Sequence, residues 1–354
     1  MRLQGTWTAI VTPFNPDLSV DWEGLERNVE FQISQGVEGL VPTGTTGESP
    51  TLDWNEHNGV IDRVLRLCKG RCGVLAGTGS NSTQEAVEST KHAVESGAEA
   101  VLMMDCYYNG PSSQELREEY YAVVASEYPD TAVVPYVIPG RTGTAISVED
   151  LAILAQEYPN VTAVKEATGD LERMARTRAL LGDEFAILSG DDDITFKIMT
   201  DPAIRADGVI SVASNVAPAA VRRMVDLAAK GDLEGARAAM EAVAPLLGVV
   251  TVKVDNPRRM PSGETLIVND RYRNPLPIKT LMAGLGMPSG ACRRPLGKMT
   301  RAGVEVVRSA ARQVWQRNPE VLAPIGEFFG VDVGARIADD KVWAALAAGF
   351  DSRS

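Results

Sequence analysis

The chain alternates eight times between a short apolar run and a longer amphipathic stretch, and this repeat constrains the fold more than any other feature. Each run is rich in β-branched and small residues, which is typical of a buried strand in a parallel sheet. The runs are TWTAIV from Thr6, GLVP from Gly39, GVLAG from Gly73, AVLMM from Ala100, AVVPYVI from Ala132, VTAVK from Val161, FAILSG from Phe185 and DGVISV from Asp207.

The amphipathic stretches between the runs carry helix signals. Several open on Ser, Thr or Asp and close on Gly or before Pro, as helices do at their ends. Eight strand–helix units within about 230 residues predict an α/β protein with a (β/α)8 TIM barrel. A doubly wound sheet usually stops at five or six strands and has a glycine-rich first turn, and no GxGxxG follows the first run.

The alternation ends near Gly231, and the rest of the chain differs in kind. We expect a catalytic barrel domain over residues 1–230 and a C-terminal helical region over 231–354 that serves packing or oligomerisation. Within that region, residues 252–273 carry Pro, Gly and alternating charges. This composition predicts a long loop, with room for a short hairpin at LIVND; by the family resemblance described below, the stretch is an insertion. A last short helix is expected near residues 342–348.

Charge excludes two classes of partner. Lys and Arg number 35 against 47 Asp and Glu, a net charge of −12, which is the wrong sign for binding a phosphate backbone or an anionic bilayer. No run approaches the roughly 18 apolar residues of a membrane helix, and the first residues, MRLQGTWTAIVTPF, do not resemble a signal peptide. We expect a cytoplasmic protein with neither a nucleic-acid nor a membrane partner.

Cysteine and histidine are too scarce for most metal or triad chemistry. The four cysteines include one close pair, Cys68 and Cys72, but no second pair that would complete a zinc site, so we expect no metal. The two histidines, His57 and His92, lie in polar helical stretches, where a solvated surface position is expected. The chemistry must then come from Lys, Tyr, Thr, Arg or carboxylates.

Lys165 is the most informative candidate. In VTAVK the period of two places Val161, Ala163 and Lys165 on one face of a strand. If that face lines the barrel, apolar surroundings lower the lysine pKa and leave a neutral amine. Such an amine condenses with a ketone to form a Schiff base. The alternative is a surface lysine paired with Glu166.

Other polar residues follow neighbouring strands. Tyr136 shares a face with Val134 and precedes Lys165 by one strand, so its phenol could relay protons; the alternative is a core tyrosine. Thr45 and Thr46 lie between glycines in PTGTTGES. Their hydroxyls and the backbone amides could hold a carboxylate; the alternative is a plain turn. Arg141 in PGRTG suits a second carboxylate, or is simply solvated.

In the right order, the chain carries TAIVTPF, GTTGES, YYNGPS, YVIPGRTG, VKEATGD, SGDDD and GVISVASN. Together these motifs resemble the dihydrodipicolinate synthase and N-acetylneuraminate lyase family of pyruvate-dependent class I aldolases. The resemblance covers roughly residues 5–230 and resumes at NPLPIKTLMAGLGMPSGACRRPL. It implies a barrel with C-terminal helices, assembled as a homo-oligomer, either a dimer or a tetramer of two tight dimers.

The resemblance also implies roles for single residues. Lys165 is the Schiff-base lysine, so no separate cofactor is needed, and Tyr136 works beside it. Thr45 belongs to the proton relay, and Tyr108 is the relay tyrosine lent across a dimer interface. The substrate-binding positions it implies are Thr46 for the pyruvate carboxylate, Arg141 with Gly143 in RTG for the second substrate, and Ile210, whose carbonyl lies near the lysine amine.

The leading functional hypothesis is condensation of pyruvate with L-aspartate 4-semialdehyde, with loss of water, to 4-hydroxy-tetrahydrodipicolinate in lysine and diaminopimelate biosynthesis. The RTG arginine favours it, whereas Val137 and Gly140 replace a polar pair that relatives often carry at the pocket rim. One alternative is another pyruvate aldolase that acts on a 2-oxo sugar acid or 4-hydroxy-2-oxoglutarate. The other is a non-catalytic homologue that binds a 2-oxo acid.

The family resemblance suggests a regulatory site as well, because lysine can inhibit family members from a cleft at the tight dimer interface. Glu85 could pair with an amino group while Asn81 and Tyr107 bind the carboxylate, and Trp54 could cover the aliphatic stem. The alternative is a set of ordinary helix-surface and interface residues. The matching positions are Ser49, Trp54, His57, Asn81, Glu85 and Tyr107.

Overall fold

Eight parallel strands close into a barrel in the computed structural model, which describes residues 3–349. Each strand pairs with the next, and β8 returns to β1. The predicted (β/α)8 barrel is therefore confirmed. The barrel strands are β1 (Gly5–Ala9), β2 (Gly39–Val41), β3 (Gly73–Gly77), β4 (Ala100–Met104), β5 (Ala132–Val137), β6 (Ala163–Glu166), β7 (Ala186–Ser189) and β8 (Gly208–Ser211).

Helices cover the outside of the barrel, and most begin at a residue that caps them. Asp53 and Ser112 each form a reciprocal cap with a Glu three residues later, the arrangement that satisfies the free amides of a first turn. The helices of the barrel are α1 (Trp22–Ser34), α2 (Trp54–Cys68), α3 (Thr83–Glu95), α4 (Ser113–Leu116), α5 (Ala122–Glu127), α6 (Pro139–Thr142), α7 (Val148–Glu157), α8 (Leu171–Leu181), α9 (Thr195–Thr200) and α10 (Pro218–Ala229), with a π-helical turn at Arg117–Tyr121.

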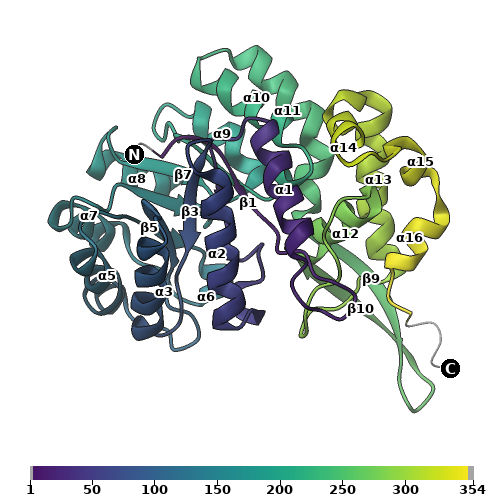
Figure 1. Cartoon of the computed structure of the whole chain (residues 1–354), viewed down its shortest axis with the longest axis horizontal. Helices are drawn as coiled ribbons and strands as arrows, with labels where there is room; N and C mark the ends of the chain where they lie inside the picture. Colours follow the sequence, from purple (N-terminus) through teal and green to yellow (C-terminus); the bar gives the residue numbers. More distant parts are fainter. Residues whose placement is uncertain (1–2, 350–354) are drawn as a thin grey trace.

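The remaining helices form a separate group beside the barrel. They are α11 (Leu233–Leu247), α12 (Leu276–Leu285), α13 (Arg301–Arg317), α14 (Ala323–Phe329), α15 (Val333–Ala338) and α16 (Asp340–Leu346). Figure 1 shows α13 to α16 on the side of the molecule opposite α3, α5 and α7. The last helix, expected near residues 342–348, is α16 and begins two residues earlier. The outer limits of the two expected domains, residues 1 and 354, lie outside the described residues.

The prediction of a long loop over residues 252–273 is wrong, and the short hairpin allowed for at LIVND is part of a much longer one. These residues form a long antiparallel hairpin of β9 (Thr251–Arg259) and β10 (Thr265–Arg273), with Thr251 opposite Arg273 and Arg259 opposite Thr265. Figure 1 shows it projecting away from the body of the protein, at the lower right. Its outer part is exposed on both faces, so the sequence lacks the apolar alternation that marks a half-buried strand.

Apolar side chains fill the barrel below the site. Trp7 of β1 is buried there, and glycines on the neighbouring strands make room for its ring. A Cβ atom at Gly39 would lie 2.2 Å from the ring, and one at Gly73 would lie 2.5 Å from it. The polar strand ends therefore stand on a solid floor, and the site is open only at the carboxyl-terminal rim. No helix within residues 3–349 is long and apolar enough to cross a membrane.

Candidate active site

Lys165 lies inside the barrel, at the carboxyl-terminal end of β6. Only 5% of its surface is exposed, and its Cα pairs in register with that of Tyr136 at the end of β5. The Lys165 amine stands 4.1 Å from the centre of the Tyr136 ring. Glu166 points the other way, out of the barrel, where the Arg173 Nε donates to its carboxylate at 3.0 Å. The surface alternative for Lys165 is therefore excluded.

Burial prepares the two groups for different tasks. It lowers the pKa of Lys165 to about 8, although the carboxylates of Asp191 and Asp192 oppose this shift. An appreciable fraction of the amine is then neutral and nucleophilic near neutral pH. Burial raises the pKa of Tyr136 to about 12, and Thr45 hydrogen-bonds to its phenol. Tyr136 thus keeps its proton and can donate it.

A cavity of about 220 Å³ opens above the Lys165 amine and collects residues from distant parts of the chain. It brings together five of the predicted site residues. Its lining comprises Thr45, Thr46, Tyr136, Ile138, Gly140, Arg141, Lys165, Ala167, Gly190, Asp191, Val212, Val250, Thr251, Arg271, Arg273 and Asn274.

Three further predicted residues lie outside this lining. Ile210 is fully buried in the barrel interior on β8. Gly143 ends α6 with a φ of 76°, a left-handed conformation that suits glycine. Tyr108 is 89% exposed and also has a positive φ, 76°. Val137, expected at the rim, is instead buried between the barrel and its helices, because it faces the same way as Glu166, its partner in β6.

The loop that carries Thr45 and Thr46 is held from below by a buried ion pair. Glu48 accepts from the Lys279 amine at 2.6 Å, and both side chains are almost fully buried. Asn274 donates to the Thr46 hydroxyl at 3.0 Å. Removing one partner of such a buried pair typically costs about 3–5 kcal/mol. Asn274 and α12 therefore position the side of the cavity that Thr45 and Thr46 form.

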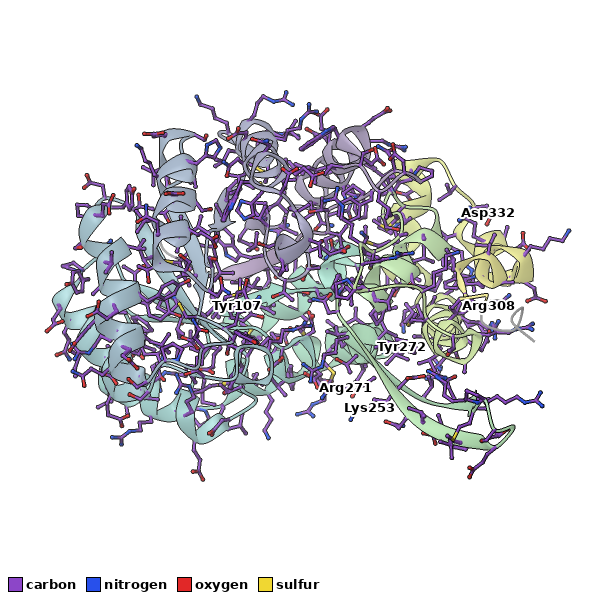
Figure 2. All side chains as sticks on the ribbon, turned by 90° about the horizontal axis from the view of Figure 1, so that it is seen from below. Tyr107, Lys253, Arg271, Tyr272, Arg308 and Asp332 are labelled. Carbon is purple, nitrogen blue, oxygen red and sulfur yellow. The ribbon has the colours of Figure 1, made fainter. Side chains whose placement is uncertain are left out.

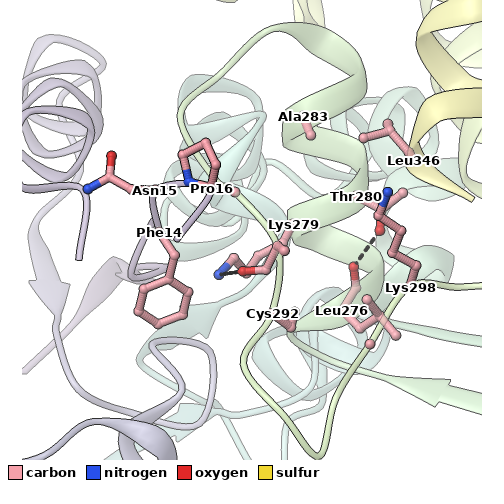
Figure 3. Close-up of a pocket in the computed structure, with 13 residues that line it drawn as sticks. Phe14, Asn15, Pro16, Leu276, Lys279, Thr280, Ala283, Cys292, Lys298 and Leu346 are labelled. Carbon is pink, nitrogen blue, oxygen red and sulfur yellow. Dashed lines mark hydrogen bonds between the residues drawn. The ribbon is translucent and has the colours of Figure 1, made fainter. Parts of the chain in front are cut away.

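Lys279 also lines a second, larger cavity, which we do not assign as the active site because the amine of this lysine is not free to react. This cavity, of about 320 Å³, lies beside α12 and is shown in Figure 3. Its lining is mostly apolar, and the amine of Lys279, its buried cation, is fully engaged. Besides Glu48, the amine donates to the carbonyls of Thr12 and Ala291, at 3.0 Å each.

Sequence reasoning missed several residues of the site. Glu48, Asp191 and Asn274 stand within motifs that carry the family resemblance, so a signal for them was present. Arg271 and Arg273 had none, because they belong to the hairpin that was expected to be a loop. The structure places both at the cavity, where the Arg273 guanidinium donates to the carbonyl of Gly140 at 2.8 Å.

The residues expected to form a regulatory cleft gather around the starts of α2 and α3. Glu85 accepts a hydrogen bond from Ser80 at 2.5 Å. Burial raises the pKa of Tyr107, and the nearby Glu85 carboxylate adds to the shift. Asn81 lies just before Ser82, the residue that caps α3. Ser49 begins a short 3-10 turn. The ring of Trp54 packs edge-on against the ring of His57, with 5.2 Å between their centres.

The expectation of a solvated His57 is wrong. The ring is 3% exposed, and burial lowers its pKa to about 4. It is therefore neutral near neutral pH. His57 lies on the inner face of α2 with Val60, Ile61 and Val64, a helical stripe that the polar residues around it in the sequence conceal.

A buried amine of lowered pKa at the carboxyl-terminal rim of a (β/α)8 barrel defines a barrel enzyme with a nucleophilic lysine. The model of the dihydrodipicolinate synthetase family matches residues 2–314. A 4-hydroxy-tetrahydrodipicolinate synthase of Sorangium cellulosum is 42% identical over 318 residues, which is 90% of this chain and 98% of that protein. The chain therefore belongs to the dihydrodipicolinate synthetase family.

Solved structures of similar proteins agree. A chloride-inhibited dihydrodipicolinate synthase from Acinetobacter baumannii, complexed with pyruvate, superposes with a TM-score of 0.78 at 35% identity, covering 88% of this chain and 98% of that one. The enzyme from Cyanidioschyzon merolae, with lysine bound, gives a TM-score of 0.78 at 32% identity, with the same coverage of 88% and 98%.

Proposed function

We propose that this protein condenses pyruvate with L-aspartate 4-semialdehyde to 4-hydroxy-tetrahydrodipicolinate, through a Schiff base on Lys165 and without a separate cofactor. The observation that carries the proposal is the Lys165 amine, buried and set 4.1 Å from the Tyr136 ring, in a cavity that also contains Arg141. The name of the Sorangium cellulosum relative and the pyruvate of the Acinetobacter baumannii structure support it.

The first half-reaction joins pyruvate to the enzyme. Thr45 and Thr46 hold the carboxylate, and the neutral Lys165 amine adds to the ketone carbon. The ketone oxygen takes one proton from the amine nitrogen and a second from Tyr136, whose phenol is hydrogen-bonded to Thr45, and leaves as water. Loss of a proton from the methyl carbon of the resulting Schiff base gives an enamine.

The second half-reaction uses the aldehyde. The enamine carbon attacks the aldehyde carbon, and the aldehyde oxygen takes up a proton to become a hydroxyl. Arg141 binds the carboxylate of this second substrate through its charged guanidinium. The amino group of aspartate semialdehyde then attacks the Schiff-base carbon, which closes the ring and releases Lys165. Overall, one water is lost, so no oxidant or reductant is required.

Borohydride trapping tests the first half-reaction. With pyruvate present, we expect borohydride to reduce the Schiff base and leave a 1-carboxyethyl group on Lys165, located by peptide mass spectrometry. The Lys165→Ala protein should keep the wild-type melting temperature and lose both labelling and turnover. A Lys165→Ala protein that is still labelled and turns over at the original rate would contradict the assignment, and an unlabelled wild type would favour the non-catalytic alternative.

A panel of acceptor aldehydes tests the second half-reaction. We expect aspartate 4-semialdehyde to give the highest kcat/KM. A higher value for cleavage of a 2-oxo sugar acid or 4-hydroxy-2-oxoglutarate would identify another aldolase of the same family, because the lysine fixes only the pyruvate half.

A further inference from the structure

Three arginines meet at the mouth of the cavity, and two of them come from the inserted hairpin. Arg141 follows β5, whereas Arg271 and Arg273 are the last arginines of β10. The Arg141 guanidinium donates to the carbonyl of Asn274 at 2.7 Å. Asn274 directly follows Arg273 in the chain. The base of the hairpin thus forms part of the cavity wall, whereas the tip of the hairpin extends away from the protein.

The register of the hairpin explains why both arginines face the cavity. Residues two apart in a strand share a face, and cross-strand partners share it with them. Tyr272, between the arginines, faces the opposite way: its ring packs on Gly303 of α13, and its hydroxyl accepts from the amide of Thr300 at 3.2 Å. Its cross-strand partner Val252 is fully buried. Figure 2 shows Arg271 and Lys253, which are cross-strand partners, near the base of the hairpin.

These arginines lack the carboxylate partners that arginines elsewhere in the chain have. Among residues 3–349, no carboxylate lies within ion-pair distance of Arg141, Arg271 or Arg273, whose only hydrogen bonds to protein go to carbonyls. By contrast, Arg258 on the same hairpin pairs with Asp270 at 2.6 Å. Burial lowers the pKa of Arg141, and the charges of Arg273 and Arg271 lower it further. Such mutual repulsion is relieved when an anion binds between the groups.

We propose that Arg271 and Arg273 complete, with Arg141, an anion subsite that binds the carboxylate of the acceptor aldehyde and of the dicarboxylate product, so that the inserted hairpin determines acceptor specificity. The inference rests on the proposed function for the identity of the acceptor. The chemical class of the ligand follows from the site itself: three guanidinium groups favour an acceptor aldehyde that carries a carboxylate over a neutral or cationic aldehyde.

The test uses single variants of the full-length protein. Arg271→Gln and Arg273→Gln each remove one charge from the cavity wall. Arg259→Gln is the matched control, because it removes the same charge from the same hairpin, near its tip and outside the cavity lining. The probe is pyridine-2,6-dicarboxylate, a flat dianion with the carboxylate spacing of the product ring, and its affinity is measured by titration calorimetry with pyridine-2-carboxylate as the monoanion.

We expect each cavity variant to weaken dicarboxylate binding about tenfold, the size of one lost charge-assisted hydrogen bond, and to weaken monocarboxylate binding less. kcat/KM for aspartate semialdehyde should fall in parallel, while pyruvate trapping by borohydride stays within about twofold of the wild type. Arg273→Lys should recover part of the affinity, because it keeps the charge. Arg259→Gln should match the wild type in every measurement.

Two results would overturn the inference: dicarboxylate affinity unchanged in both cavity variants, or an equal loss in Arg259→Gln. The outcomes also separate this inference from the proposed function. If aspartate semialdehyde is not a substrate but the cavity variants still lose dicarboxylate affinity, the subsite stands and the proposed acceptor is wrong. If aspartate semialdehyde is turned over equally by both variants and the wild type, the function stands and the subsite does not.

Discussion

Lys165 and Glu166 are neighbours in β6, yet they occupy opposite environments. Lys165 points into the barrel beneath the cavity, whereas Glu166 points outward to Arg173. The period of two in VTAVK predicts that the two side chains lie on opposite faces of the strand, one inside the barrel and one outside. It does not predict which of the two faces inward. The strength of the burial was not predictable, since it depends on Tyr136 and on the strands that close the barrel.

The pKa of Lys165 predicts how the first half-reaction depends on pH. Because the pKa is about 8, the neutral fraction of the amine rises through pH 7 to 9 and then levels off. The rate of Schiff-base formation at saturating pyruvate should follow it. Since the Asp191 carboxylate raises this pKa, Asp191→Asn should move the rise to lower pH by about one unit. Single-turnover trapping across pH measures both curves, and a profile unmoved in Asp191→Asn would contradict the interaction.

Other residues show the limits of local sequence patterns. The motif that contains Val137 places it at the pocket rim, but strand periodicity turns its side chain outward from the barrel. The polar neighbours of His57 predict a surface position, but the residue lies on the buried face of α2. Arg271 and Arg273 reach the cavity only because a hairpin far along the chain folds back over it. The first two errors could have been corrected from periodicity, whereas the third needs the tertiary fold.

At the scale of elements, the structure separates what apolar patterning specifies from what it does not. All eight barrel strands were predicted close to their observed bounds, because a parallel strand covered on both faces is a continuous apolar run. For β9 and β10 the sequence predicts a long loop with at most a short hairpin at LIVND, because their outer parts are exposed and β9 contains Pro257, which argues against a strand. The hairpin is specified instead by its own antiparallel pairing and by the anchoring of Tyr272 and Val252.

The starts of α2 and α3 are the elements that the regulatory hypothesis concerns. Glu85 lies close enough to Tyr107 to affect its pKa, so a carboxylate and a phenol are available together for an amino acid. We predict partial inhibition by L-lysine, and we expect Glu85→Ala to weaken it about tenfold without changing the KM for pyruvate, because Glu85 would pair with an amino group. Initial rates at increasing L-lysine measure this, with Glu88→Ala, exposed on the same helix, as the control. Activity unaffected by millimolar L-lysine would remove the regulatory hypothesis and leave the catalytic one intact.

For the whole molecule, the C-terminal region matters to the site through α12 as well as through the hairpin. Lys279 of α12 joins Glu48 to the carbonyls of Thr12 and Ala291. The loop with Thr45 and Thr46 is therefore positioned by a helix that lies outside the eight strand–helix units. Because the hairpin leads directly into α12, Thr45, Thr46 and the hairpin arginines are positioned by one continuous segment of the chain.

Tyr108 is the proposed relay residue that a single chain does not bring to its own cavity. It is 89% exposed and is held in a left-handed conformation, which costs about 1 kcal/mol or more for a residue other than glycine. A side chain presented in this way fits a tyrosine that reaches the cavity of a second copy. We therefore predict that the active form is a homo-oligomer and that Tyr108 acts in trans.

Mixed oligomers test this prediction. Tyr108→Phe and Lys165→Ala should each be nearly inactive alone. In a dimer containing one of each, the Tyr108→Phe protomer keeps its lysine and receives Tyr108 from its partner. Random assembly of equal amounts should then restore about a quarter of the wild-type activity, since half of the dimers are mixed and each has one complete site. Co-purification through two different tags isolates the mixed species for assay. A mixed dimer as inactive as its parents, or a Tyr108→Phe protein with full activity, would show that Tyr108 has no role across an interface.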